Sequence, residues 1–189
     1  MFVVTSAGVI ATDPIGYGRP EAVVTYVDEI KKVAGGQPIE QERLMQVKDP
    51  HTVLADETMD ASRTLPKQKV LFAVDFVSVG SFPGRGMIDA YPLEWEDSLK
   101  KVLAMDWEKL VPGHPGQPGG RLGTKKDVQD LLTLLQDVSA AVKTEAQAGK
   151  CWDGVEKGLK LLKYEAWPGY ETGLPMVLRR YCGLWGRGT

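Results

Sequence analysis

The chain lacks several features that mark common classes of protein. It has no excess of basic side chains, with 23 Lys and Arg against 25 Asp and Glu. Because binding to a phosphate backbone depends on a surplus of positive charge, we expect no nucleic-acid partner. No stretch approaches the roughly 18 apolar residues of a membrane-spanning helix, so we expect no membrane partner. Residues 1–10 show neither a basic segment nor a small-residue cleavage site, which predicts a cytoplasmic protein without a signal peptide.

Cysteine and histidine are also scarce, with two residues of each type. Cys151 and Cys182 are compatible with a disulfide and equally with two separate thiols in a reducing compartment. The histidines are His51 and His114, whereas a catalytic zinc usually has three protein ligands beside an open position. The small number of candidate ligands therefore limits any metal site that this chain builds alone.

The chain does contain enough apolar sequence for a core. Its 189 residues are 43% hydrophobic, which suffices for one substantial core. Segments typical of strands alternate with segments typical of helices, a pattern that favours α/β layers. We therefore expect a single α/β domain that spans residues 1–189.

The first part of this domain, residues 1–36, has the pattern of two strands followed by a helix. Short runs of β-branched residues lie on either side of a Ser6-Ala7-Gly8 turn, as in a hairpin. The helix is expected to begin at Pro20 and to end at Gly35, since proline favours the first helical position and glycine favours the end. Residues 37–69 are predicted to be a poorly defined junction, because they are rich in Asp, Thr, Ser and Pro and show no sustained period.

The C-terminal half, residues 70–148, is expected to contain two strands, each followed by a helix. The expected elements are a buried strand at Val70–Val74, a helix at Leu93–Ala104, a short strand at Leu110–Val111 and a helix at Val128–Ala148. Thr124 or Asp127 is expected to cap the last of these helices. Residues 149–189 predict a helical C-terminal extension, with two shorter helices around an aromatic segment.

Two side chains that are able to bind metals follow the two strands of the C-terminal half. Asp75 ends the apolar run, and His114 follows the second strand through Pro112-Gly113. A carboxylate at the end of an apolar strand is costly to desolvate unless a cation or several donors compensate it. Carboxylate and imidazole are both zinc ligands, and open α/β sheets place their sites at strand ends. The other interpretation is that Asp75 is an N-cap or a loop hydrogen-bonder and that His114 is a surface residue.

The order of these motifs resembles that of metallo-β-lactamase-fold hydrolases. The motifs are Val74-Asp75, a Trp-containing helix, Pro112-Gly113-His114 and a long helix, and the opening hairpin and helix are similar to the ββα start of that fold. The tail is similar to the extension in a branch related to the quinoprotein-associated zinc hydrolases. The resemblance covers roughly residues 1–36 and 65–181. It implies an αββα sandwich and zinc-assisted hydrolysis of a small-molecule substrate, with Asp75 as the bridging aspartate and His114 as the last histidine ligand.

The chain departs from the family pattern in its metal ligands. The HxHxDH motif is absent, and His51 lies in a loop-like segment without that motif around it. The strands that carry a later histidine ligand also have no counterpart, because residues 63–66 meet residues 67–70 without an intervening ladder. The resemblance therefore implies an incomplete sandwich that lacks internal strands, binds zinc at most weakly, and has impaired or no catalysis.

Two further expectations follow from this shortening. The alternative to a zinc hydrolase with an incomplete metal site is a non-catalytic relic, or a protein-interaction scaffold without bound metal. Loss of internal strands would also leave unpaired sheet edges, and such edges pair with other chains. The sequence therefore predicts a homo-oligomer that forms through exposed sheet edges.

Overall fold

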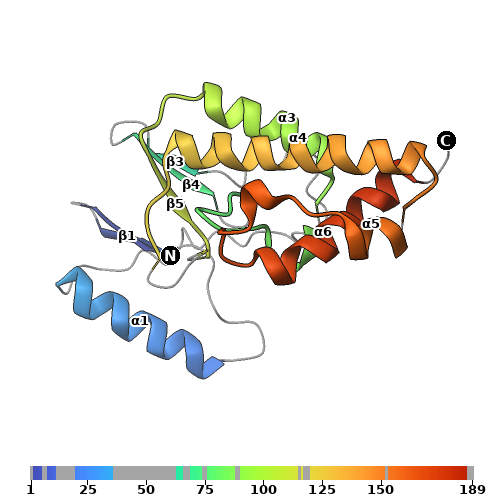
Figure 1. Ribbon diagram of the computed structural model, residues 1–189. Helices are drawn as coiled ribbons and strands as arrows, with labels where there is room; N and C mark the ends of the chain where they lie inside the picture. Colours follow the sequence, from blue (N-terminus) through green and yellow to red (C-terminus); the bar gives the residue numbers. More distant parts are fainter. Residues whose placement is uncertain are drawn as a thin grey trace. The chain divides into compact units, whose positions relative to one another are not determined.

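The computed structural model shows helices and short strands in two units (Figure 1). It describes residues 2–5, 8–11, 20–35, 63–65, 69–73, 76–87, 90–114, 116, 120–151 and 153–186. The units are Met1–Thr52 and Val53–Thr189, and each is described by itself. Within the described residues, no helix is long and apolar enough to cross a membrane.

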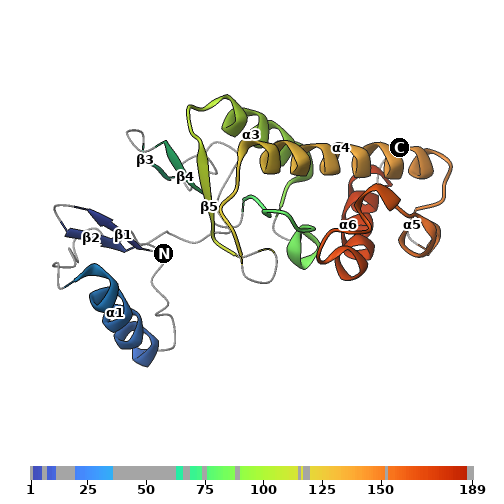
Figure 2. The ribbon, with the colours of Figure 1, turned by 60° about the vertical axis from the view of Figure 1, so that its left-hand side comes forward.

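The N-terminal unit contains the expected hairpin and helix (Figure 2). Strands β1 (Phe2–Thr5) and β2 (Gly8–Ala11) pair in antiparallel fashion. Helix α1 (Pro20–Ala34) begins with its proline, whose fixed φ suits the first helical position. The helix ends before Gly35, which has a φ of +61° that a residue without a Cβ adopts readily.

The C-terminal unit is built on a three-stranded sheet with the order β3-β4-β5. Its strands are β3 (Arg63–Leu65), β4 (Val70–Ala73) and β5 (Lys109–Pro112). β4 lies between the others, antiparallel to β3 and parallel to β5. Leu71 of β4 and Leu110 of β5 are fully buried, so apolar burial holds the parallel pair in the core. The unit is a mixed α/β structure, as the alternation of elements predicts.

Strand β3 lies within residues 37–69, the junction that the sequence left poorly defined. It pairs with β4 from Arg63 opposite Phe72 to Leu65 opposite Val70. Three residues are too few for the alternation of a strand to stand out from a polar loop. Most of the predicted junction, residues 37–69, lies outside the described residues.

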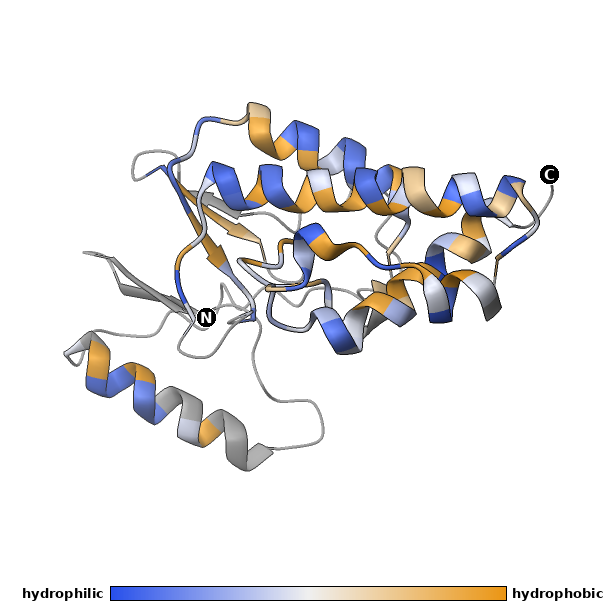
Figure 3. Cartoon of the chain, in the orientation of Figure 1, coloured by the Kyte–Doolittle hydropathy of each residue, from blue (hydrophilic) through white to orange (hydrophobic). Residues whose placement is uncertain are grey.

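Two helices of the C-terminal unit pack side by side (Figures 1 and 2). Helix α3 (Pro92–Ala104) connects the parallel strands β4 and β5, as a crossover helix must. Helix α4 (Lys125–Gln147) follows β5 and carries an apolar stripe. The fully buried members of the stripe are Leu131, Leu134, Leu135, Val138 and Val142. Figure 3 shows polar and apolar residues on different sides of α4, which is the pattern of a helix that covers a core.

The start of α4 uses both of the residues that the sequence offered as caps. Thr124 is the N-cap, and its amide and hydroxyl each donate a hydrogen bond to the Asp127 carboxylate at 2.8 Å. The Arg121 guanidinium donates to both oxygens of the same carboxylate. Burial opposes ionisation of Asp127, but the hydrogen bonds from Arg121 and Thr124 outweigh it and lower its pKa.

The C-terminal extension is helical, as expected. It consists of α5 (Asp153–Gly158), the 3₁₀ turn η5 (Leu162–Tyr164) and α6 (Tyr170–Trp185). Helix α6 packs on α4 and on η4 (Gly84–Met87), a 3₁₀ turn in the segment between β4 and α3. The buried residues on α6 include Leu174, Val177, Leu178, Tyr181 and Cys182.

The two cysteines, which the sequence left open as a disulfide or as separate thiols, form a disulfide. Their Cα atoms are 5.6 Å apart, a separation typical of disulfides. Cys151 lies just after α4 and Cys182 lies within α6, so the bond joins segments that are 31 residues apart. Helix packing brings them together, and spacing along the chain gave no sign of it.

Candidate functional site

The candidate site lies where the parallel strands β4 and β5 end. Their register runs from Val70 opposite Lys109 to Ala73 opposite Pro112. Because the strands are parallel, both carboxyl ends reach the same edge of the sheet. Loops at this edge are where open α/β sheets bind ligands. The structure thus brings together the two strand ends that the sequence singled out.

The structure places one of the two predicted ligands directly. His114 follows β5 after Gly113, and its side chain is exposed. Asp75 lies outside the described residues, as does His51. Among the described residues, no group of three or more His, Cys, Asp and Glu side chains is arranged to hold a metal ion. A catalytic zinc needs three protein ligands, so the described residues alone do not fit one.

The loops that follow the two strands pack closely against each other. Gly116 has a φ of +66°, and a Cβ there would lie 2.5 Å from the Val79 carbonyl oxygen and 2.9 Å from the Ser81 Oγ. A Cβ on Gly123 would lie 2.8 Å from the Val79 side chain, which is fully buried. These two glycines therefore allow close contact between the two segments.

Two further contacts fasten the segment after β4 to the helices. The Trp95 Nε1 of α3 donates a hydrogen bond to the Phe76 carbonyl at 2.9 Å. The Phe82 amide donates a hydrogen bond to the Pro168 carbonyl at 2.9 Å. The Phe82 ring contacts the Tyr170 ring edge-on, with 5.7 Å between the ring centroids. These contacts join residues far apart in the sequence, so no local pattern could predict them. They give the strand edge firm support on two sides.

A second surface feature is an open hollow of about 530 Å³ on α4 and η5. Its lining residues are Asp137, Ala140, Ala141 and Thr144 of α4 with residues 160–164. The Tyr164 hydroxyl donates to the Asp137 carboxylate at 2.6 Å, and Lys163 pairs with the same group at 2.8 Å. Burial and the hydrogen bond to Asp137 raise the pKa of Tyr164 to about 12. These groups satisfy one another, which indicates a structural contact between η5 and α4.

The edge of the sheet thus carries the exposed imidazole of His114. The chemistry of this imidazole depends on which side chains lie next to it. A neutral imidazole binds a divalent metal or exchanges a proton. Comparison with protein-family models and with curated proteins finds no significant match. The functional assignment therefore depends on the residues and on the geometry of this edge.

Proposed function

We propose that this chain is a metallo-β-lactamase-fold protein of the zinc-dependent hydrolase type. Its set of metal ligands is incomplete, which leaves catalysis impaired or absent. The register of β4 and β5 carries the proposal. Paired residues differ by 39 positions (109 − 70 and 112 − 73). Asp75 and His114 differ by the same 39 positions (114 − 75). Because Asp75 and His114 have the same spacing as the paired residues of β4 and β5, we expect both side chains at the same edge of the sheet.

Chain connectivity supports this placement independently of any side-chain contact. Asp75 is two residues beyond Ala73, and His114 is two residues beyond Pro112, its register partner. Two residues span at most about 7 Å of chain, and neighbouring strands are about 5 Å apart. A carboxylate and an imidazole held at this edge would share one small region of the surface.

The proposed fold is an incomplete αββα sandwich that lacks internal strands. The order β4, α3, β5 and α4 supports it, with parallel strands joined by a Trp-containing helix. The Trp95 hydrogen bond to Phe76 gives that tryptophan a role at the end of β4.

A bound zinc would generate a hydroxide nucleophile and polarise a small-molecule substrate. Asp75 and His114 are too few to hold a catalytic zinc, because water would have to fill the other positions. We therefore expect weak zinc binding and derive no catalytic step from this pair. A metal-free interaction scaffold is the alternative.

Zinc titration of the dialysed, full-length chain tests the proposal. We expect weak, saturable binding that falls at least about tenfold in both Asp75→Ala and His114→Ala, because each removes half of the protein ligands. Asp97→Ala is the matched carboxylate control, since Asp97 is exposed on α3 and pairs with Lys100. Binding that is equal in all four proteins, or absent from the unaltered chain, would reject the zinc site and support the scaffold.

The predicted homo-oligomer remains part of the proposal. In the described part of the chain, β3 pairs with a strand on one side only. An edge strand with an open side is able to pair with the same strand of a second copy. Light scattering is expected to show an oligomer, and Thr64→Pro, which removes a backbone donor from β3, is expected to weaken it. A monodisperse monomer at high concentration would contradict this expectation.

A further inference from the structure

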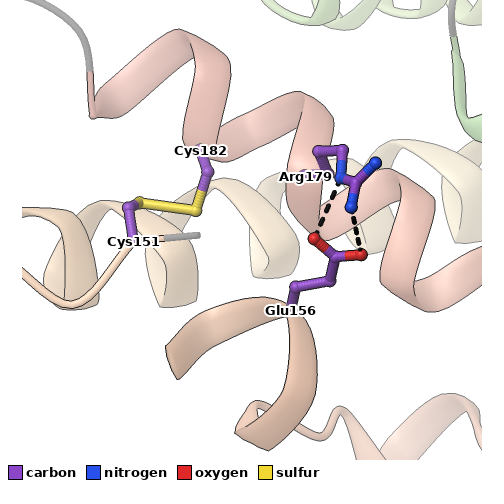
Figure 4. The surroundings of a disulfide bond; sticks show 4 residues. All are labelled: Cys151, Glu156, Arg179 and Cys182. Atoms are coloured by element: carbon purple, nitrogen blue, oxygen red, sulfur yellow. Dashed lines mark hydrogen bonds and ion pairs between the residues drawn. A yellow bond between two sulfur atoms is a disulfide. The ribbon is translucent and has the colours of Figure 1, made fainter. Parts of the chain in front are cut away.

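The Cys151–Cys182 disulfide joins the chain just before the short helix α5 to helix α6. Cys151 lies two residues before α5 begins, and Cys182 lies on α6 (Figure 4). The two cysteine residues differ in exposure, because Cys182 is fully buried whereas Cys151 is half-buried. A reagent in solution therefore meets the Cys151 side of the bond first.

Beside the disulfide, the described part of α5 also packs against α6. The helix has six residues, which is too short for stability on its own. Arg179 of α6 donates two hydrogen bonds to Glu156 of α5, at 2.9 and 2.8 Å, beside the disulfide (Figure 4). The Arg179 side chain is 65% exposed, and ion pairs on the surface contribute little. Val155 is the one residue of α5 in the buried core cluster.

The contact between α6 and α4 does not depend on the disulfide in the same way. Trp185 of α6 donates from Nε1 to the Ser139 Oγ at 3.1 Å, and Lys143 lies 4.5 Å from the centre of its ring. Val177 and Leu178 of α6 are fully buried. Helix α6 therefore keeps its place on α4 through packing, whereas the six-residue helix α5 is too short to be stable without its neighbours.

We propose that the Cys151–Cys182 disulfide is a redox-operated lock that holds α5 on α6. A dithiol reductant opens it in two steps of thiol–disulfide exchange. A reductant thiolate attacks the Cys151 sulfur, and Cys182 leaves as a thiolate that takes up a proton. The second reductant thiol then attacks the mixed disulfide and releases Cys151, which also gains a proton. Two electrons and two protons pass to the protein, and the reductant becomes a disulfide.

Opening the lock changes the surface of the C-terminal unit. A small hollow between the end of α4 and α5 is lined by Glu145, Gly154, Val155, Gly158 and Leu159. Released α5 withdraws Val155 and Leu159 from this contact and exposes the apolar groups beneath them. The reduced and oxidised proteins are thus expected to differ locally at α5, with the α4–α6 core unchanged.

Hydrogen exchange of the full chain, with and without dithiothreitol, tests the lock. The amide of Leu159 donates to the Val155 carbonyl at 3.0 Å and reports on α5. We expect exchange in α5 to rise about tenfold or more on reduction, with a change below about twofold in the middle of α4. Cys151→Ser is expected to match the reduced protein and not to respond to dithiothreitol. Glu156→Gln, which removes only the ion pair, is expected to keep its protection while oxidised.

Three outcomes would overturn the lock. One is protection of α5 that is unchanged by reduction, and another is an equal rise in α4 and α5, which would mean general destabilisation. The third is a titre of two free thiols in the protein purified without reductant, since the bond would then be absent. None of these results bears on zinc binding at the strand edge, so this inference stands or falls independently of the proposed function.

Discussion

Replacing Asp127 by alanine removes the hydrogen bonds that organise the start of α4. The carboxylate accepts from Thr124 and from the Arg121 guanidinium, and its side chain is 7% exposed. Loss of such a cap costs about 1 kcal/mol, and a charged hydrogen bond contributes about 1.5–3 kcal/mol. Because the Arg121 side chain is 42% exposed, water screens its share. We therefore expect Asp127→Ala to lower the free energy of unfolding by about 2–3 kcal/mol.

Urea denaturation followed by tryptophan fluorescence measures this loss as a lower midpoint with an unchanged slope. Asp130→Ala is the matched control on the same helix, since Asp130 forms an ion pair with the exposed Lys126. That pair contributes less than about 0.5 kcal/mol. Equal midpoints for the two variants would refute the importance assigned to the buried cap.

The pH dependence of the stability of the unaltered protein and of Asp127→Ala gives a second test. The pKa of Asp127 is lowered from 3.8 in the folded state, although burial alone would raise it. Its stabilising effect is therefore present above the unfolded pKa and is lost as the pH falls through the folded pKa. The difference between the unaltered protein and Asp127→Ala is expected to shrink below about pH 4.

Two other predictions concern α3 and the strand-edge loops. Burial raises the pKa of the Glu96 carboxyl group above 4.5 despite the nearby Lys100. The contribution of Glu96 to stability is therefore present below its pKa in the unfolded chain and is lost as the pH rises through its pKa in the folded protein. Glu96→Gln is therefore expected to raise the melting temperature at pH 7 and to leave it unchanged at pH 4, whereas a lower value at pH 7 would contradict the reasoning. Gly116→Ala is expected to destabilise by about 2 kcal/mol more than Gly149→Ala in urea titrations, because both positions have a positive φ but only Gly116 would clash. Equal losses of stability in the two variants would show that the strand-edge loops accommodate the added methyl group without strain.

The sequence predicted α4 well because its information is local. Apolar residues recur every three or four positions from Leu131 to Val142, and this spacing defines a buried stripe without knowledge of the partner surface. Thr124 and Asp127 were alternatives as caps. The structure uses both, because one is the N-cap and the other is the third helical residue of a capping box.

Features that join distant segments could not be predicted in this way. The hydrogen bond from Phe82 to Pro168 and the Cys151–Cys182 bond depend on how α6 packs, which no periodicity encodes. The candidate site is intermediate between these cases. Strand ends were visible in the sequence, and the parallel register came from the structure.

The parallel pairing of β4 and β5 also has a consequence for the order of folding. Val70 meets Lys109 across 39 residues, so the pair closes a long loop and forms late compared with helices. At 5–20 residues per second, a ribosome needs roughly 2–8 s to synthesise those 39 residues. During this interval, β3 is the one strand of the described residues that is able to pair with β4. Nascent chains are therefore most vulnerable to aggregation before β5 emerges, and a chaperone that binds extended apolar segments would protect them at this stage.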